Sequence, residues 1–278
     1  MNKQSTNNTL VVGQSQQCVH ALNVERVLID LAQTTAQAAD WGVQLLVLPE
    51  MSITGYNITP TEIADVAEES DGRIYAEVAK LCQQHNMAIV YGYAERSTNG
   101  NFYNSAQLID HNGTSLLNYR KSHLWGDLDR GLFAAGDALS PVVEVFGWKV
   151  GAAICYDAEF PETLRHLTLK GAELLVVPTG LMSPWQEVAE QVIPVRAYEN
   201  RVYVAYTNLC GEERDLSYVG HSCMADPNGI VLASALSEPV LLTATLERKV
   251  LIEARASLPY LSQRRPDLYT ALIDPDIT

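Results

Sequence analysis

An internal repeat is the feature that most constrains the fold of this chain. The segment GVQLLVLPEMSITGY (42–56) matches GAELLVVPTGLMSPW (171–185) along its length. Each copy contains a short continuous apolar run, which is typical of a strand that is covered on both faces. Such strands occur where helices or a second sheet pack on either side. The repeat therefore predicts a layered α/β domain.

The same order of elements surrounds both copies. Helical spacing over 22–40 leads into the first copy, and a helix over 73–86, a strand over 87–95 and a hairpin turning at Asn112-Gly113 follow it. In the second half we expect strands over 148–155, 173–179 and 200–208, a helix over 161–170, and a matching turn at Asn228-Gly229. Two halves with one strand order predict an internal pseudo-twofold, with two sheets face to face and helices outside.

The charge and the cysteine usage narrow the class of protein. The formal net charge of −14 disfavours binding to nucleic acid or to anionic membranes. No apolar stretch approaches the roughly 20 residues of a membrane span, and the first ten residues lack a secretory signal. Five cysteines without a CxxC pair, and scattered histidines, indicate free thiols and no metal site. We expect a cytoplasmic protein without metal or cofactor.

Three residues at or just after expected strand ends offer complementary chemistry: Glu50, Lys121 and Cys155. Taken singly, each has an ordinary interpretation: an acid that reaches solvent, a solvated edge lysine and an inert core thiol. Taken together, they supply the base that forms a thiolate, the nucleophile, and a cation for an oxyanion. A fixed donor at an oxyanion contributes about 3–4 kcal/mol.

Three segments resemble the signature segments of the nitrilase superfamily of carbon–nitrogen hydrolases: LLVLPEMSITGY, NYRKSHLWGDLDR and VGAAICYDAEFPE. Two later segments, VRAYENRVYVAYTN and VGHSCMADPNG, are also similar, and the resemblance runs from about residue 9 to 250. It implies a four-layer αββα sandwich, a single domain over 1–278 with a C-terminal arm over 251–278, and a homodimer or higher homo-oligomer. The arm could also pack on its own subunit.

The resemblance also implies the catalytic roles. Glu50 would be the general base, Lys121 the oxyanion stabiliser, Cys155 the nucleophile, and the backbone N–H of Tyr156 the second oxyanion donor. Many members carry a glutamate eight positions after the lysine, where this chain has Asp129. Asp129 would then be the supporting acid, with Asp127 or water as the alternative.

Within the superfamily, TGYNI, AIVYGYAER, ICYDAEFPE and YTNLCG are most similar to bacterial 5-aminopentanamidases of lysine degradation. That similarity implies hydrolysis of a small ω-amino amide to a carboxylate and ammonia through a thioester. Glu159 stands where relatives that act on carboxylated substrates often have arginine, so it could select an ammonium. Alternatively, Glu159 caps or salt-bridges the helix that begins at Pro161.

Further positions complete the expected site. Tyr56, Trp125 and Trp185 could wall a slot for the methylene chain, although aromatic residues there are more often core. We also expect Thr179, the counterpart of Glu50 in the second copy, to be a substrate-binding residue. We assign structural roles to four other residues: His123, Arg196, Glu199 and Asn200. The functional alternatives are a nitrilase, a broad-specificity aliphatic amidase, and a catalytically dead binding protein.

Overall fold

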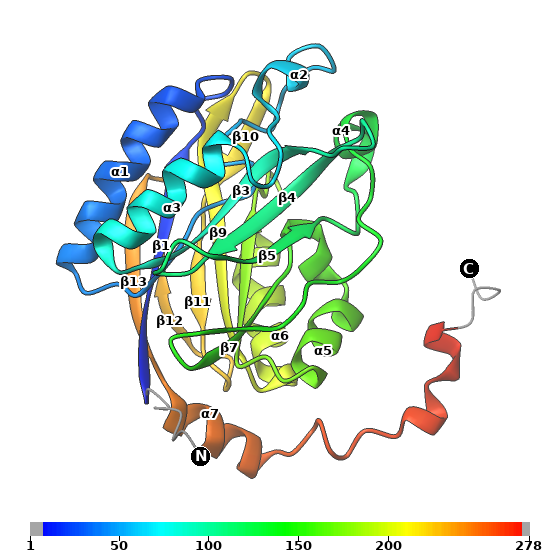
Figure 1. Cartoon of the computed structure of the whole chain (residues 1–278). Coiled ribbons are helices and arrows are strands. Elements are labelled where there is room, and N and C mark those ends of the chain that lie inside the picture. Colours follow the sequence, from blue (N-terminus) through cyan, green and yellow to red (C-terminus); the bar gives the residue numbers. More distant parts are fainter. Residues whose placement is uncertain (1–7, 274–278) are drawn as a thin grey trace.

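The computed structural model describes residues 8–273 and contains two β-sheets packed face to face, with helices on both outer surfaces (Figure 1). The first half contributes β1 (Thr9–Cys18), α1 (Val24–Asp40), β2 (Leu45–Val47), α2 (Ile63–Val66), α3 (Arg73–His85), β3 (Ala88–Arg96), β4 (Phe102–Ile109) and β5 (Ser115–Arg120). The connection and second half contribute α4 (Gly126–Leu132), β6 (Val143–Val145), β7 (Trp148–Ala152), α5 (Pro161–Leu169), β8 (Leu174–Thr179), α6 (Ile193–Asn200), β9 (Tyr203–Glu213), β10 (Leu216–Val219), β11 (Cys223–Ala225), β12 (Val231–Ser234), β13 (Val240–Glu247) and α7 (Arg248–Ser257). The expected αββα sandwich is confirmed.

The predicted pseudo-twofold is confirmed by the strand order. In the first sheet β1, β2 and β3 are parallel, and β4 and β5 continue it antiparallel. In the second sheet β7, β8 and β9 are parallel, and β11 and β12 continue it antiparallel. The two hairpins turn at Gly113 and Gly229, whose φ values of +81° and +77° favour glycine.

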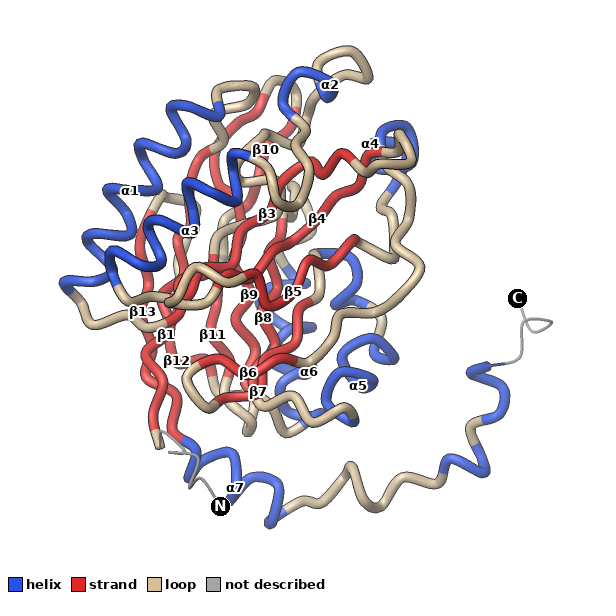
Figure 2. The backbone as a smooth tube through the Cα atoms, in the orientation of Figure 1, coloured by secondary structure: helices blue, strands red, loops and turns tan. Residues whose placement is uncertain are grey.

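Three apolar cores among the described residues fill the spaces between the four layers. Figure 2 shows the layers themselves, with strands in the middle and helices on the outside. Leu45 and Val47 of β2 point into the space between the sheets, whereas Leu46 points toward α1 and α3. In β8, Leu174 faces the other sheet and Leu175 faces α5 and α6. Strands with apolar neighbours on both faces need continuous rather than alternating apolar runs, which accounts for the repeat.

The two sheets are joined along one seam. At the ends of β1 and β9, Gln17 lies opposite Leu209 and Cys18 opposite Cys210 in a short parallel pair. Beyond this junction, the last part of β9 pairs with β10 in an antiparallel hairpin. The sequence does not predict this junction, because its partners are almost two hundred residues apart.

Two strands differ from the expectation by several residues. The strand expected over 148–155 ends at Ala152, and a 3₁₀ turn over Cys155–Glu159 begins at the cysteine. The strand expected over 200–208 begins at Tyr203 and continues to Glu213, because β10 and β1 supply further partners.

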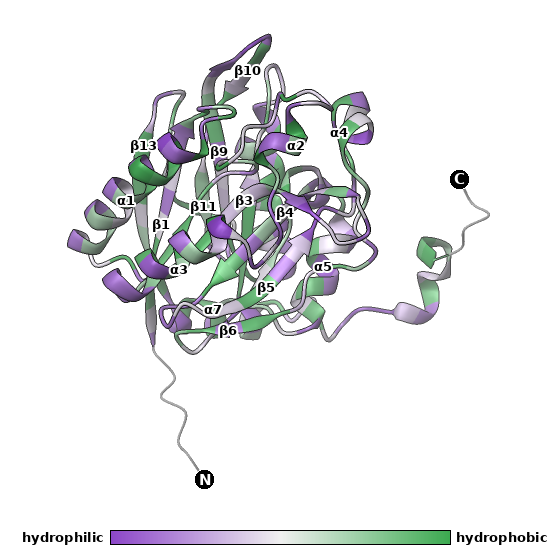
Figure 3. Ribbon diagram, turned by 45° about the horizontal axis from the view of Figure 1, so that its top comes forward, coloured by the Kyte–Doolittle hydropathy of each residue, from purple (hydrophilic) through white to green (hydrophobic). Residues whose placement is uncertain are grey.

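After α7 the chain leaves the body as an extended segment with two short 3₁₀ turns (Figures 1 and 3). Leu251 and Ala254 of α7 are buried, but the residues after Ser257 are largely exposed. The single domain and the crossing of the arm onto a partner stay predictions. Within residues 8–273, no helix combines the length and the hydropathy that crossing a membrane requires.

Candidate active site

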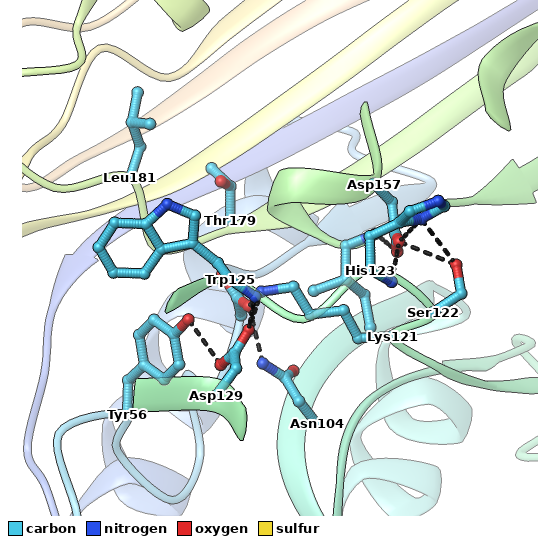
Figure 4. A network of polar contacts seen from close by, with 12 residues as sticks. Tyr56, Asn104, Lys121, Ser122, His123, Trp125, Asp129, Asp157, Thr179 and Leu181 are labelled. Carbon is cyan, nitrogen blue, oxygen red and sulfur yellow. Dashed lines mark hydrogen bonds and ion pairs between the residues drawn. The ribbon is translucent and has the colours of Figure 1, made fainter. Parts of the chain in front are cut away.

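Glu50 and Lys121, which lie 71 positions apart, meet inside the protein just beyond the ends of β2 and β5. Lys121 Nζ donates to Glu50 Oε1 at 2.7 Å and to Asp129 Oδ2 at 2.7 Å, and all three side chains are completely buried. Figure 4 shows the lysine with Asp129 and Asn104 beside it. Burial favours neutral lysine, but the two carboxylates outweigh it and hold the pKa of Lys121 above its usual range.

One oxygen of Glu50 is fully engaged and the other is free. Oε1 accepts from Lys121 and from Asn104 Nδ2, at 2.7 Å each. Oε2 is buried and has no hydrogen-bond partner among residues 8–273. Burial raises the pKa of Glu50 above its ordinary value, although the charge of Lys121 opposes this. A buried carboxylate with one free oxygen is suited to accept a proton.

Cys155 opens the turn that follows β7, with a φ of +46°, which is uncommon for a residue other than glycine. Its thiol is hydrogen-bonded to the Thr179 side chain and to the Gly180 backbone. Burial and the negative charge of Glu50 raise the thiol pKa, whereas Lys121 and the two hydrogen bonds oppose the rise. The thiol therefore lies within the electrostatic field of Glu50 and of Lys121.

Asp129 occupies the place expected of the supporting acid. The short helix α4 brings it back onto Lys121, where it also accepts from the Tyr56 hydroxyl and from the Trp125 backbone N–H, at 2.8 Å each. Asp127 is exposed on the same helix and lies 4.0 Å from Arg130. The contact with Lys121 thus belongs to Asp129 and not to Asp127.

Asp157 joins the two segments that carry Lys121 and Cys155. Its buried carboxylate accepts from the backbone N–H of Ile154 at 3.0 Å, and from the Tyr119 hydroxyl at 2.7 Å. It also accepts from Ser122 Oγ at 3.0 Å and from the His123 backbone N–H at 2.9 Å (Figure 4). Burial alone would raise the pKa of Asp157, but hydrogen bonds from the His123 side chain, the Ile154 N–H and the Tyr119 hydroxyl bring it below its usual value. The sequence analysis missed this residue, although it lies only two positions after the cysteine.

His123 has the structural role that the sequence suggested. Its Nδ1 lies 2.8 Å from Asp157 Oδ1 and 3.0 Å from Ser122 Oγ, and its ring stacks on Phe160. Serine, histidine and aspartate are also the residues of a hydrolase triad. Here, however, the serine and the aspartate contact the same imidazole nitrogen, so the ring cannot relay a proton between them.

A cavity of about 220 Å³ opens onto the thiol. Its wall is mainly aromatic and aliphatic, and Trp185, which is 54% exposed, marks its outer side. The lining residues are Tyr56, Trp125, Cys155, Tyr156, Glu159, Gly180, Leu181, Met182, Trp185 and Val188. Thr179 does not line the cavity but lies behind the sulfur, where its hydroxyl donates to the Tyr206 hydroxyl at 3.0 Å.

Sequence reasoning identified the aromatic part of this wall but not its aliphatic part. Leu181 and Met182 follow β8 in the second repeat copy, and Val188 lies in the π-helical turn over Val188–Val192. The repeat held no signal for them, because their counterparts in the first copy, residues 52–53, are buried and are not among the described lining residues.

Glu159 lies half-buried in the cavity wall, and it is the only residue with a carboxylate or a cationic group among the described lining residues. No hydrogen bond or ion pair holds its carboxylate within residues 8–273. Phe160 is the N-cap of α5 and no side chain caps this helix, so the alternative role of Glu159 as a cap is wrong. Burial raises the pKa of Glu159, opposed by the charges of Lys121 and Arg196.

The Arg196 side chain, on α6, supports the turn that begins at Cys155 by binding the backbone of that turn. It donates to the carbonyl oxygens of Ala158 at 3.0 Å and Glu159 at 2.6 Å, and forms an ion pair with Glu199 at 3.2 Å. Asn200 Nδ2 donates to the Arg196 carbonyl at 2.9 Å. These contacts are structural, as the sequence suggested.

Strand β9 holds both walls of the cavity. The Glu213 carboxylate accepts from the backbone N–H groups of Tyr56 at 2.9 Å and Asn57 at 3.0 Å. On the opposite side, Asn208 Oδ1 accepts from Leu181 N–H at 2.7 Å, and its Nδ2 donates to the Leu181 carbonyl at 3.3 Å. The shape of the cavity therefore depends on the position of one strand.

The chain is similar to known proteins over most of its length. Residues 11–256 match the model of the family described as carbon-nitrogen hydrolase. A Pseudomonas protegens protein described as "Hydrolase in pqqF 5'region" is 48% identical over 251 residues, which are 90% of this chain and 87% of that protein. An (R)-stereoselective amidase of Pseudomonas sp is 37% identical, over 88% of this chain and 86% of its own length.

Solved structures of a Nesterenkonia amidase have the same fold. One has a TM-score of 0.86 at 27% identity, covering 98% of this chain and 100% of that chain. A glutamate-to-glutamine variant of that amidase has a TM-score of 0.85 at 28% identity, covering 96% of this chain and 98% of its own. In that variant the active-site cysteine carries the acetamide moiety of fluoroacetamide.

Proposed function

Because the chain belongs to the carbon–nitrogen hydrolase family, we propose that this cavity is the active site of an amidase for small ω-amino amides such as 5-aminopentanamide. One observation carries the choice of substrate: an apolar cavity opens onto the thiol, and its single carboxylate, Glu159, has no partner among the described residues. The family membership and the amidase relatives support hydrolysis of an amide bond.

In the proposed reaction the thiol of Cys155 loses its proton to Glu50, whose free Oε2 is available to accept it. The thiolate attacks the amide carbon, and the oxyanion that forms is stabilised by Lys121 and by the backbone N–H of Tyr156. Glu50 returns the proton to the departing ammonia, which leaves a thioester on Cys155. A water molecule activated by Glu50 then releases the carboxylic acid.

Asp129 supports this cycle without touching the substrate carbon. Its contact keeps Lys121 charged while Glu50 alternates between its ionised and protonated forms. Asp129 also accepts a hydrogen bond from the Tyr56 hydroxyl, and Tyr56 lines the cavity. The same carboxylate therefore holds that part of the cavity wall in place.

Glu159 is the proposed selector of the substrate. The apolar wall can contact the methylene groups, and a charge-assisted hydrogen bond to Glu159 would hold the terminal ammonium. A carboxylated substrate would be repelled by the same group. No cationic side chain among the described residues contacts the Glu159 carboxylate, so an ammonium ligand would satisfy it.

The test is ammonia release across matched amides: ω-amino amides of increasing length, the uncharged pentanamide, and the monoamide of glutaric acid. We expect kcat/KM to be highest for an ω-amino amide, with Glu159→Gln removing its advantage over pentanamide and Glu159→Arg favouring the carboxylated amide. Glu162→Gln removes an exposed acid three positions further on and should leave the preference unchanged. Equal rates on charged and uncharged amides in the parent protein would exclude this role of Glu159.

The same assay separates the alternatives. Each amide is paired with its nitrile, and a nitrilase would convert the nitrile to acid and ammonia. A dead binding protein would release ammonia from neither. Homodimer formation and a place in lysine degradation remain predictions from the resemblance, and a cytoplasmic location remains a prediction from the cysteine usage.

A further inference from the structure

Two thiols face each other at the seam between the sheets. Cys18 ends β1 and lies in register opposite Cys210 of β9, in the parallel pair that joins the sheets. Their sulfur atoms are 3.8 Å apart, and Cys18 is partly exposed whereas Cys210 is buried. An oxidant can therefore reach one member of a pair whose second member is already in contact.

The Cys18 sulfur is confined toward β9. A Cβ added at Gly211 would lie 3.1 Å from Cys18 Sγ, so the sulfur rests against the backbone of the partner strand. Elsewhere in residues 8–273 the thiols have other neighbours: Cys82 donates to the Ile109 carbonyl and Cys223 to the Ala189 carbonyl. Those contacts leave them no second thiol to react with.

We propose that Cys18 and Cys210 form a modification site at which a hydroperoxide converts the two thiols into a disulfide that crosslinks the sheets. The Cys18 sulfur first attacks one peroxide oxygen and breaks the O–O bond, which gives a sulfenic acid and, from hydrogen peroxide, one water molecule. The Cys210 thiol then attacks that sulfenic sulfur, and its proton leaves with the hydroxyl group as a second water molecule. The two sulfurs lose two electrons and the peroxide gains them.

The backbone is compatible with this bond. Neighbouring strands lie about 4.8 Å apart. Disulfides join residues whose Cα atoms are about 4.4–6.8 Å apart. The sulfurs need to approach by about 2 Å to reach bonding distance, which side-chain rotation can supply. Burial raises the pKa of Cys210 to about 12, so the first oxidation step belongs to the more exposed Cys18.

The crosslink would fix the strand on which the cavity walls depend. Cys210 lies between Asn208, which holds Leu181, and Glu213, which holds the backbone of Tyr56. Because the two cysteines are 192 positions apart, a bond between them closes a long loop and strongly restricts the unfolded chain. We therefore expect the oxidised protein to be more resistant to heat than the reduced one.

The experiment uses the full chain with Cys155→Ser, so that the cavity thiol consumes no oxidant. The folded protein is treated with hydrogen peroxide, its remaining thiols are blocked, and it is digested without reduction for mass spectrometry. We expect one linked peptide pair that contains Cys18 and Cys210, lighter by two hydrogen atoms than the sum of its reduced peptides. The unfolding temperature should rise by several degrees and return to its starting value with dithiothreitol.

Variants in the same background supply the controls. Cys18→Ser should abolish both the linked peptides and the rise in unfolding temperature, and Cys18→Ala serves the same purpose if the serine variant does not fold. Cys82→Ser should retain both effects. Recovery of Cys18 as an unlinked thiol or sulfinic acid would overturn the site, and a linked pair without a change in unfolding temperature would overturn the stabilising crosslink. Neither readout depends on amide hydrolysis.

Discussion

At the residue scale, we expect the environment of Glu50 to set the pH dependence of amide hydrolysis. Burial raises the pKa of Glu50, and the charge of Asp129 raises it further. A protonated Glu50 cannot accept the thiol proton, so kcat/KM should fall as the pH drops through a pKa above the ordinary value of 4.5. Asp129→Asn removes one of the causes of that rise, so the acid limb of the profile should move to lower pH. An acid limb that stays in place, or moves upward, in the kcat/KM profile would contradict this assignment.

Gly180 allows a close approach between the backbone and the site. A Cβ at this position would lie 3.1 Å from the Tyr56 ring and 3.2 Å from Glu50 Oε2. Gly180→Ala should therefore displace the base by a few tenths of an ångström and lower kcat several-fold, less than the roughly 100-fold that a 1 Å misplacement costs. Gly131→Ala in α4, where a Cβ meets open space, is the matched control and should leave kcat unchanged. Steady-state kinetics on both variants tests the difference, and equal kcat values would argue against a positioning effect.

The contacts of individual residues were only partly predictable from the sequence. The types and positions of Glu50 and Lys121 pointed to one site, and the structure places them in direct contact. Asp157 was missed because an acid after a cysteine has no distinctive local pattern. Its partner His123 lies 34 positions earlier in the chain, so only folding shows the acid to be buried and fully bonded.

At the scale of elements, Asp157 holds the exit of β5 against the turn after β7. Asp157→Asn keeps the shape but loses the charge that accepts from Tyr119, Ser122 and the backbone, so Lys121 and Cys155 should lose their alignment. We expect kcat to fall by about 100-fold with little change in KM. Ser122→Ala removes one of these donors and should cost much less. Kinetics and unfolding temperatures measured together test this, and a folded Asp157→Asn protein with the parent kcat would refute it.

Strand β9 is expected to control substrate binding more than the chemical step. Glu213→Gln replaces the charged acceptor of the Tyr56 and Asn57 N–H groups, so this wall should loosen and KM for ω-amino amides should rise several-fold. Glu212→Gln, at an exposed position of the same strand, is the control. A fall in kcat at constant KM would place Glu213 in the chemistry instead.

The elements themselves were predictable, whereas their ends were not. Continuous apolar runs identified β2 and β8, since both faces of these strands are covered. The end of β9 depends on hydrogen bonds to β10 and β1, and no local pattern shows where such distant partners stop. The turn that begins at Cys155 depends in the same way on a distant strand, because Tyr119 of β5 donates a hydrogen bond to Asp157 in that turn.

At the scale of the whole molecule, the two halves share one topology but contribute different chemistry. Glu50 follows β2 and Thr179 ends β8, at equivalent positions of the repeat, and both act on the sulfur of Cys155. One copy thus supplies a carboxylate and the other a hydroxyl to the same thiol. The sequence indicated the repeat. The structure shows in addition that the ends of the two repeated strands, β2 and β8, lie beside the same thiol.

The thioester can be detected by mass spectrometry of the protein quenched in acid during turnover of 5-aminopentanamide. We predict an aminopentanoyl group on the peptide that contains Cys155, and no ammonia release from the Cys155→Ser variant. An acyl group on another residue, or ammonia release from Cys155→Ser at the parent rate, would contradict it.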